Sequence, residues 1–399
     1  MKPLKLAYLV SHPIQYQAPM LRLVAQQPEI DLTVFFCSKI SLNQFTDPEF
    51  KQSITWDVPL LEGYKHRFLP VVGRDDTLGF ARPWVYGLKR ELKRGEFDAL
   101  WIHGWGRWSH IWAIVTGRRL GLMVLLRGEA GLHLDPPCGI KKWVKDHFVK
   151  WLIPKVGRFL TIGSQNRAFY LRHGADSRKL YDVPYAVDNG FFQKRAEEAS
   201  RSREELRRIL GLEPGRPVIL YASKMIARKC AGDLLEAYAR LSPDQRAEPR
   251  QYLLFVGDGE LRPELEARAA GFGWRSVRFL GFKNQTELPR YYDLCDVFVL
   301  PSRQEPWGLV INEVMNAARA VIVSDEVGCG ADLVRHGENG YIFPAGDIAG
   351  LAHALQQVSA DPERMADMGR RSLAIINRWG FDEDIAGLKQ ALAGARGTV

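Results

Sequence analysis

The chain has 399 residues, more than one hydrophobic core usually organises, so its length predicts two domains. Its 46% apolar and 25% charged residues are ordinary globular values, which exclude a long disordered tail. The net charge of +9 comes from the first half: residues 1–200 hold 29 basic against 19 acidic residues, and residues 101–180 hold 14 against 4, whereas residues 201–399 hold 26 against 27. Such a region predicts attraction to nucleic acid, nucleotides or anionic lipid headgroups.

The cysteines and the N-terminus indicate the compartment. The five cysteines lie far apart, with no pair at metal-ligand spacing, so we expect buried thiols in a reducing cytoplasm. The first apolar run, LAYLV, is too short for a signal-peptide core, and no run approaches the roughly 20 apolar residues that span a bilayer. We therefore expect a cytoplasmic protein, either soluble or peripheral on the inner face of the cell membrane.

Short apolar runs alternate with stretches of helical period along the chain. They span residues 4–10, 31–37, 98–103, 122–127 and 159–164 in the first half, and residues 217–223, 252–257, 277–282, 297–301 and 320–325 in the second. Continuous apolar runs predict strands covered on both faces, as in parallel sheets with helical crossovers. The two series predict two doubly wound α/β domains, residues 1–190 and 191–380, followed by a helix over 381–394 capped by Asp382. Ligands of such sheets bind at the carboxyl ends of the strands, and two such domains facing one another would form a cleft.

Two histidines follow predicted strands of the first domain. His12 lies in SHPIQYQAP, where Pro13 fits the first turn of a helix and Ser11 or His12 would cap it. His103 ends the strand 98–103. Each is either a site residue or a structural histidine, and the sequence leaves both alternatives open.

Residues 138–160 combine basic and aromatic side chains in one predicted helix. The helix places Trp143, Phe148, Trp151 and Leu152 near one face, with Lys141, Lys142, Lys145 and Lys150 around them. This pattern suits an anionic membrane surface, although core packing is the commoner fate of a crossover helix. Trp105, Trp108 and Trp112 are spaced like one helix face, which either stacks on a sugar or packs inside; we expect packing.

The strongest candidate site follows the strand 297–301, in SRQEPWGLVINEV. A helix should begin near Gly308, so that the N–H groups of Trp307, Gly308 and Leu309 form an anion site for a phosphate. Glu305 lies beside that site, and Glu313 lies one to two turns into the helix, loosely on the same side. The two carboxylates would then touch opposite ends of one elongated ligand. The alternative is a capped helix with a solvated Glu313.

Two further loops at strand ends suit the same ligand. Lys224 and Lys229 follow the strand 217–223, where lysines can neutralise a diphosphate. The loop 281–288, GFKNQTEL, offers backbone groups of the kind that bind a nucleobase edge.

Together these segments resemble a known family. GDGELRPELE (257–266) and the stretch from VRFLGF to FPAGD (277–347) resemble the carboxyl-terminal half of family 4 glycosyltransferases, retaining enzymes of the GT-B fold that belong to the glycosyl transferases group 1. The first half is similar more faintly, through DALWIHGWG, TIGSQNRAFYLRHGA and VPYAVDNGFF. The resemblance covers essentially the whole chain. It implies two Rossmann-like domains facing across a cleft, with the segment from about 381 crossing back to the first domain.

The resemblance also implies a role for each residue of the motifs. Glu305 would be catalytic, holding hydroxyls of the transferred sugar, and Glu313 would bind the ribose. Backbone groups of Trp307, Gly308 and Leu309 would meet the sugar and the distal phosphate. Lys224 and Lys229 would bind the diphosphate, and the loop around Phe282 would cover the base.

Two segments depart from the family pattern. Ser223-Lys224 stands where the family usually has Gly-Arg, which keeps the charge but loses a bidentate fork. LLRGEAG (125–131) lies where relatives often place a functional histidine, so Arg127 or Glu129 is a candidate for that role. His103 and Arg127 are therefore our catalytic candidates in the first domain, and His12 and Glu129 our acceptor-side candidates.

The chemistry fits these residues. Breaking a glycosyl-phosphate bond gives an oxocarbenium-like centre and a departing diphosphate, which cations and a helix N-terminus stabilise. We predict retaining, metal-independent transfer from a nucleotide-diphosphate sugar to a glycan or lipid-linked acceptor, with no cofactor, in cell-surface polysaccharide or lipopolysaccharide synthesis. Two acidic clusters, Asp75-Asp76 and residues 382–384, are interpreted as loop and helix-cap residues rather than metal ligands.

Two alternatives remain. One is a nucleotide-sugar epimerase with the same two-domain fold, and the other is a non-enzymatic polyanion binder. The balanced charge of the second half and the lack of a nucleic-acid-binding motif argue against the latter, so we expect no nucleic-acid partner.

Overall fold

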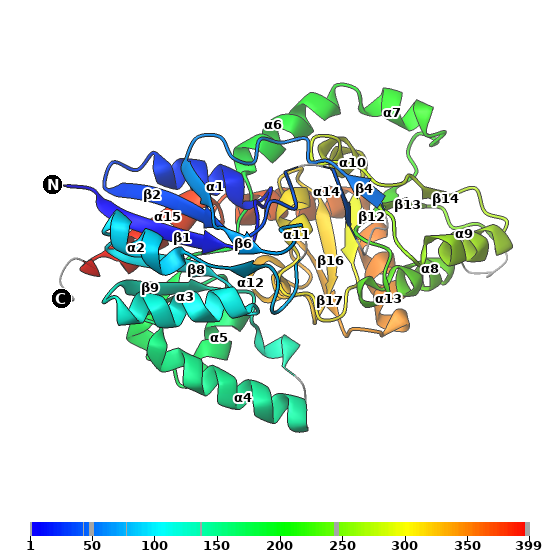
Figure 1. Cartoon of the computed structure of the whole chain (residues 1–399). Helices are drawn as coiled ribbons and strands as arrows, with labels where there is room; N and C mark the ends of the chain where they lie inside the picture. Colours follow the sequence, from blue (N-terminus) through cyan, green and yellow to red (C-terminus); the bar gives the residue numbers. More distant parts are fainter. Residues whose placement is uncertain are drawn as a thin grey trace. The chain divides into compact units, whose positions relative to one another are not determined.

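The computed structural model describes residues 2–42, 44–47, 52–76, 78–135, 138–242 and 247–395. The chain divides into two compact α/β units (Figure 1). Unit 1 consists of Met1–Phe45, Val58–Tyr185 and Phe381–Val399, and unit 2 consists of Thr46–Asp57 and Ala186–Gly380. The C-terminal helix therefore belongs to the first unit, and a short segment from the first half of the chain belongs to the second.

Unit 1 is built on a seven-stranded, wholly parallel sheet in the order β11-β10-β9-β8-β1-β2-β5. Its strands are β1 (Leu4–Val10), β2 (Ile30–Phe36), β5 (Lys65–Phe68), β8 (Ala99–His103), β9 (Met123–Arg127), β10 (Arg158–Thr161) and β11 (Leu180–Asp182). The five inner strands are those that the apolar runs predict. The two edge strands, β5 and β11, are short and half-exposed, so they have no continuous apolar run to reveal them.

Helices cover both faces of this sheet (Figure 1). They are α1 (Gln17–Ala25), α2 (Leu88–Gly95), α3 (Trp108–Arg119), α4 (Ile140–Leu152), α5 (Ser164–Arg172) and α15 (Phe381–Leu392). Helices α2 to α5 bury side chains in one common core with the strands, among them Leu92, Ile114, Val149 and Phe169. Helix α15 packs against α1, β10 and β11. A two-stranded hairpin, β6 (Val71–Val72) with β7 (Trp84–Val85), precedes α2.

The first helix begins later than its cap residues predicted. Helix α1 starts at Gln17 after a turn in which the Gln17 N–H donates to the Ile14 carbonyl at 3.0 Å, and its N-cap position is Tyr16, with no side-chain cap. The prediction that Ser11 or His12 caps this helix is wrong. The Ser11 hydroxyl instead lies 2.8 Å from Nδ1 of His12.

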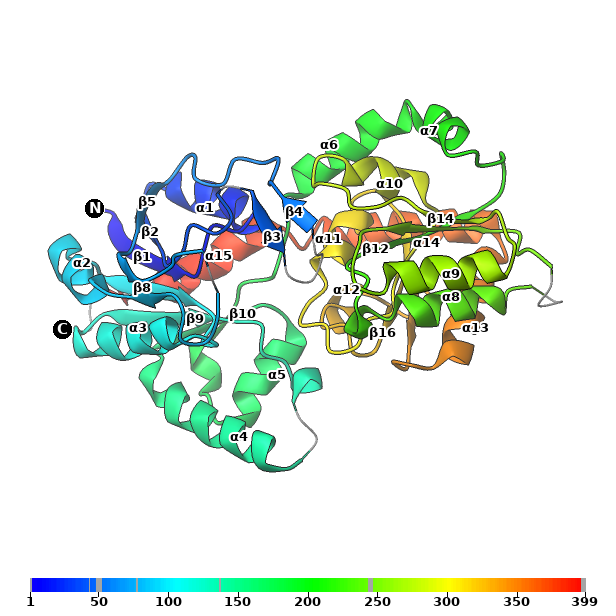
Figure 2. The ribbon, with the colours of Figure 1, turned by 45° about the vertical axis from the view of Figure 1, so that its right-hand side comes forward.

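Unit 2 contains a six-stranded parallel sheet in the order β14-β13-β12-β15-β16-β17. Its strands are β12 (Val218–Ala222), β13 (Tyr252–Val256), β14 (Val277–Phe279), β15 (Val297–Leu300), β16 (Ala320–Ser324) and β17 (Gly340–Phe343). Its helices are α6 (Asn189–Ser200), α7 (Arg203–Ile209), α8 (Ala231–Ala239), α9 (Arg262–Gly271), α10 (Leu288–Leu294), α11 (Leu309–Met315), α12 (Gly330–Leu333), α13 (Ile348–Ser359) and α14 (Pro362–Ile376). Figure 2 shows α8 and α9 side by side, and both bury residues in the core of this unit. A short ladder joins β3 (Phe45–Asp47) to β4 (Gln52–Ile54).

The cysteines differ at one position from their expected burial. Cys37, Cys230, Cys295 and Cys329 are buried as predicted, but Cys138 is exposed, and all five are free thiols. No helix among the described residues is both long and apolar enough to cross a membrane.

Candidate functional site

The carboxylate of Glu305 is held where two strands of unit 2 end. Glu305 follows β15, its N–H donates to the Glu326 carbonyl at 3.0 Å, and its own carbonyl accepts from the Gly328 N–H at 3.0 Å. These bonds form a parallel bridge to the loop after β16. The residue is only 8% exposed, so the side chain occupies a fixed position at the carboxyl edge of the sheet.

Glu305 forms an ion pair with Lys229. Nζ of Lys229 donates to Oε2 of Glu305, and Nη1 of Arg228 lies 3.9 Å from the same oxygen. The lysine sits in a single helical turn after β12, and its side chain is 12% exposed. Burial lowers the pKa of Lys229, and Glu305 opposes that shift. The sequence predicted both residues as donor ligands but did not predict that they pair.

Lys224 lies in a loop that two glycines allow to pack closely. The Tyr221 hydroxyl donates to the Lys224 carbonyl at 2.8 Å, and Lys224 itself is half-buried. Gly257 has a φ of +123°, and a Cβ there would stand 2.1 Å from the Ser223 carbonyl oxygen. The GDG motif after β13 therefore lets one loop lie directly on the loop that contains Lys224.

Trp307 supports the site with its side chain rather than lining it. Its indole N–H donates to Oδ1 of Asn312 at 2.9 Å, its ring stacks on Trp379 with centroids 5.6 Å apart, and it is 3% exposed. The side chain of Trp307 is therefore buried within unit 2 and does not line the site.

Gly308 makes the turn into α11, as predicted. Its φ is +92°, and a Cβ there would lie 3.0 Å from Cδ2 of Leu300 and 3.1 Å from Cγ1 of Val327. Leu309 is the first helical residue. The first N–H groups of a helix have no intrahelical acceptor, so the start of α11 beside Glu305 is a candidate for binding an anion.

Glu313 is buried. Its side chain is 1% exposed and accepts a hydrogen bond of 2.5 Å from the hydroxyl of Tyr292, a residue of α10. The alternative of a solvated Glu313 is wrong, because α10 covers this face of α11. The assignment of Glu313 to a ribose stays a prediction.

The loop 281–288 is joined to the segment that unit 2 takes from the first half of the chain. Nδ2 of Asn284 donates to the Thr55 carbonyl at 2.7 Å, and the Thr286 N–H donates to Oδ2 of Asp57 at 3.1 Å. Phe282, the predicted base-covering residue, is half-buried in this loop. Nothing in the local sequence predicts contacts between residues 229 positions apart.

In unit 1, polar side chains gather where β1 and β8 end. His12 follows β1, His103 ends β8, and His110 lies on α3. Burial lowers the pKa of His12 and of His110 to about 4, helped by the charge of Arg107, and it lowers the pKa of His103 to about 3, helped by Arg127. All three imidazoles are therefore neutral near pH 7.

Several buried polar atoms of this cluster have no partner among the described residues. They are Nδ1 of His103, both ring nitrogens of His110, Oε1 of Gln15 and Nε2 of Gln17. The Gln17 side chain does accept a hydrogen bond of 2.9 Å from the Tyr8 hydroxyl. Because buried polar groups are normally paired, these atoms form a candidate hydrogen-bonding site for hydroxyl groups. Sequence reasoning missed Gln15, Gln17 and His110.

Arg127 is tied into the structure of unit 1. It is 2% exposed, and its Nη2 donates to the carbonyls of Val183 and Pro184 and to Oδ2 of Asp384 at 2.8 Å. Asp384, on α15, is 1% exposed and not a surface cap residue, and burial raises its pKa against the opposing effect of Arg127. The catalytic role of Arg127 stays a prediction, and these contacts favour a structural one.

Glu129 differs from Arg127 in being exposed. Its Oε1 accepts a hydrogen bond of 2.8 Å from the Tyr185 hydroxyl. Its acceptor-side role stays a prediction, as does metal independence. Among the described residues no group of three or more His, Cys, Asp or Glu side chains is arranged to hold a metal ion.

The chain matches a known family and several known proteins. The family described as "Glycosyl transferases group 1" matches residues 202–373, which include Lys224, Lys229, Glu305 and Glu313. The alpha-D-kanosaminyltransferase of Streptomyces kanamyceticus is 31% identical over 295 residues, 71% of this chain and 74% of that protein. The lipopolysaccharide core biosynthesis glycosyltransferase LpsE of Rhizobium meliloti is 35% identical over 161 residues, 39% of this chain and 44% of that protein.

The fold matches solved glycosyltransferases over the whole chain. HepE from Anabaena, solved in complex with UDP, has a TM-score of 0.72 at 15% identity, over 98% of this chain and 100% of HepE. At that identity the likeness shows the fold alone. The predicted fold class, parallel sheets in two α/β domains as in GT-B glycosyltransferases, is confirmed.

Proposed function

The chain belongs to the glycosyl transferases group 1 family, and from that premise we propose that it moves a sugar from a nucleotide-diphosphate donor to a glycan or lipid-linked acceptor, with retention and without a metal. The observation that supports the donor assignment is the cluster of Glu305, Lys229 and the start of α11 at one edge of the unit 2 sheet. It lies within the residues that the family matches.

The residues of this cluster suit the separation of charge in the reaction. The bond between the anomeric carbon and the phosphate oxygen breaks, and a bond from the acceptor oxygen to that carbon forms on the same face. The acceptor proton passes to the departing diphosphate. Lys224, Lys229 and the first N–H groups of α11 would stabilise the negative charge that develops on the diphosphate, and Glu305 would accept hydrogen bonds from hydroxyls of the sugar.

The first unit would supply the acceptor contacts. A base with a pKa of about 3 removes protons poorly at neutral pH, so His103 would act as a neutral hydrogen-bond acceptor for a hydroxyl rather than as a strong base. The unpaired side-chain atoms of Gln15, Gln17 and His110 would form hydrogen bonds with further hydroxyls of the acceptor.

The name of one relative supports a role in surface glycan synthesis. One relative is named for lipopolysaccharide core synthesis, and the basic, aromatic stretch 138–160 suits contact with an anionic membrane. We infer an acceptor that is a cell-surface polysaccharide or lipopolysaccharide precursor, and action in the cytoplasm at the inner face of the membrane.

A thermal-shift screen with UDP-, GDP- and ADP-sugars tests the donor assignment. A ligand that binds the folded state raises the melting temperature by mass action, by an amount that grows with its concentration. The matching donor should then be consumed in the presence of acceptor, with retention at the anomeric carbon by NMR. If none of these nucleotide sugars raises the melting temperature, the result contradicts the donor site. Free sugar or a rearranged donor formed without acceptor identifies the epimerase alternative instead.

A further inference from the structure

Exposed apolar side chains are concentrated in one part of unit 1. Of the thirteen large hydrophobic side chains that are exposed among the described residues, ten lie between residues 72 and 151. Six of these ten are on α3 and α4, two neighbouring helices of the layer that covers one face of the unit 1 sheet (Figures 1 and 2). Large contiguous apolar patches are uncommon on soluble proteins and usually mark an interaction surface.

Helix α4 presents an apolar stripe outward. Ile140 is 83% exposed, Trp143 62%, Val144 53% and Trp151 45%, and their spacing places all four on one helical face. The opposite face is seated in the core through Val149 and Leu152. The sequence placed Leu152 and Phe148 with the two tryptophans. That prediction is wrong, because Leu152 is buried and Phe148 half-buried.

Helix α3 adds two tryptophans to the same layer. Trp108 and Trp112 lie one turn apart and are 43% and 46% exposed, so the expectation that they pack inside is wrong. Trp105, by contrast, packs against the core. Its ring lies 5.5 Å from that of Phe148, which lies 5.8 Å from Trp151. This row of rings connects the start of α3 with the exposed stripe of α4.

The cations of α4 fall into two classes. Lys142 pairs with Asp146 at 3.0 Å and Lys145 with Asp135 at 2.6 Å. Lys141 and Lys150 are exposed, and neither has an acidic partner within the described part of the chain. At 100° per residue these two lysines fall at the two borders of the apolar stripe, whereas the paired lysines fall on the other side of the helix.

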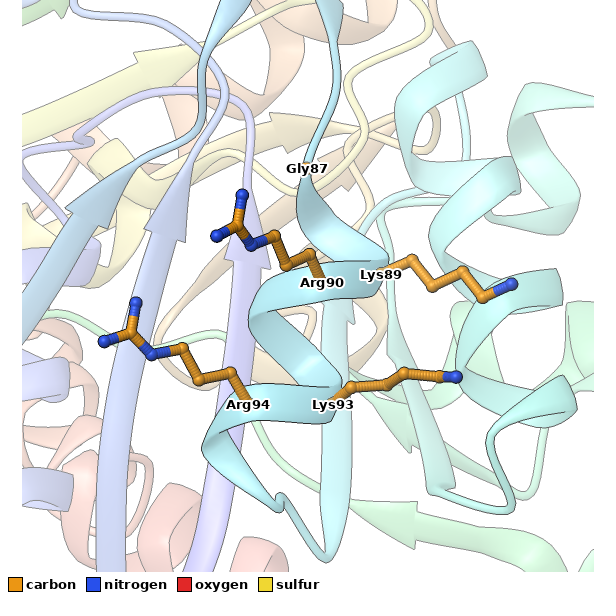
Figure 3. Close-up of a pocket in the computed structure, with 5 residues that line it drawn as sticks. All are labelled: Gly87, Lys89, Arg90, Lys93 and Arg94. Carbon is orange, nitrogen blue, oxygen red and sulfur yellow. The ribbon is translucent and has the colours of Figure 1, made fainter.

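The adjacent helix α2 extends the positive charge. Lys89, Arg90, Lys93 and Arg94 are all exposed around a shallow depression that begins at Gly87. Figure 3 shows Lys89 and Lys93 on one side of α2 and Arg90 and Arg94 on the other. Helix α2 contacts α3. The same helical layer thus combines exposed aromatic and aliphatic side chains with cations.

We propose that the outer surface of α3 and α4 docks on an anionic phospholipid bilayer. The side chains of Ile140, Trp143, Val144 and Trp151 enter the headgroup boundary, and Lys141 and Lys150 contact lipid phosphates. Interfacial tryptophans flanked by lysines suit a membrane surface. Ile140 and Val144 have no flat face for stacking on bases, which argues against a single-stranded nucleic acid as the occupant. The link between this surface and a lipid-linked acceptor rests on the proposed function, but the docking itself requires no sugar transfer.

Flotation of the full chain with vesicles tests this surface. We expect binding to phosphatidylcholine vesicles containing phosphatidylglycerol, weaker binding to phosphatidylcholine alone, and release at high salt. The double variant Lys141→Gln/Lys150→Gln should bind the anionic vesicles more weakly, by about fivefold for each lysine that is removed. The variant Trp143→Ser/Trp151→Ser should lose about tenfold or more in affinity and remain folded, with a modest fall in melting temperature because Trp151 also contacts Phe148.

The matched control is Lys194→Gln/Ile209→Ser, which changes an exposed cation and an exposed apolar residue of unit 2. It should float like the unmodified chain, and so should Glu305→Gln. Failure of the unmodified chain to float, or equal loss in the control, overturns the proposal. Binding to single-stranded RNA but not to vesicles also overturns it. The thermal-shift screen for the donor contains no lipid. Its result therefore tests the proposed function separately from the docking proposal.

Discussion

At the scale of single residues, the pairing of Lys229 with Glu305 bears on how a donor would enter the proposed site. The two side chains neutralise one another in a place with little access to water. In the proposed function, a diphosphate that binds Lys229 would displace the carboxylate of Glu305, which could then accept hydrogen bonds from hydroxyls of the sugar. A buried charge without a partner is strongly destabilising. Replacing the carboxylate by a phosphate as the partner of Lys229 therefore costs less free energy than leaving the buried ammonium group without an anion. If the proposed donor site is right, the pair would link phosphate binding to the release of the carboxylate proposed to bind the sugar.

This exchange predicts opposite effects of Glu305→Gln on binding and on transfer. Removing the carboxylate removes the competitor for Lys229, so the affinity for the nucleoside diphosphate should rise by about fivefold to tenfold while transfer is lost. Glu305 also raises the pKa of Lys229. In the variant the lysine should therefore lose its proton at a lower pH, and the gain in affinity should disappear toward alkaline pH sooner than in the unmodified chain. Calorimetric titration over a range of pH measures both effects.

The control for this experiment is Arg228→Gln, at a cation 3.9 Å from the same carboxylate with a side chain that is 42% exposed. This variant should lower the affinity for the nucleoside diphosphate only slightly, because solvent screens an exposed charge. Lys229→Met should lower the same affinity by about tenfold or more. Unchanged or weaker nucleotide binding in Glu305→Gln contradicts the exchange.

At the scale of elements, the sequence predicted all the inner strands and only one of the four edge strands. Nine of the ten apolar runs correspond to inner strands, because both faces of an inner parallel strand are buried, and the tenth, 277–282, corresponds to the edge strand β14. The edge strand β5 alternates exposed and half-buried residues, so it had no such run. The turn at Gly308 and the spacing of Glu305 from Glu313 are local and were predicted. The pairing of Lys229 with Glu305 and the contact of Asp57 with Thr286 bring together residues 76 and 229 positions apart, which no local pattern encodes.

The attachment of α15 to unit 1 gives an element-scale prediction. Arg127 and Asp384 form a buried pair at 2.8 Å between the end of β9 and the C-terminal helix. Arg127→Met leaves Asp384 buried without its partner and should reduce the free energy of unfolding by about 3 kcal/mol or more. Asp384→Asn should cost a similar amount, and the two together should cost less than their sum, because each breaks the same pair. Urea unfolding of the three variants measures this.

Kinetics on the folded protein distinguish this role from a catalytic one. If Arg127 only positions α15, the transfer rate per folded molecule should remain within a few-fold for Arg127→Met at low temperature. A fall of several orders of magnitude with an intact fold and unchanged donor affinity would restore the predicted catalytic role. Additive stability losses in the double variant would contradict the pairing.

At the scale of the whole chain, the last helix should be required by the first unit and not by the second. Helix α15 buries Leu388 and Ala391 completely, its Lys389 pairs with Glu29 at 2.7 Å, and Nη1 of Arg158 donates to the Ala393 carbonyl. The core cluster of unit 2 contains no residue of this helix. A chain ending at Gly380 should therefore expose apolar surface in unit 1 and leave Arg127 buried without a carboxylate.

Hydrogen exchange measured by mass spectrometry tests this prediction on the truncated chain. Amides of β10 and β11 should lose most of their protection, because α15 packs on both strands, while amides of β12, β13 and β15 should keep theirs. The control is a chain ending at Ala395, which retains α15 and should behave like the full chain. Donor binding in the thermal-shift assay should survive the truncation, since Lys229, Glu305 and Gly308 all belong to unit 2. Protection of β10 and β11 that persists without α15, or loss of protection spread equally over both sheets, would show that the helix does not complete the first unit in the way its contacts indicate.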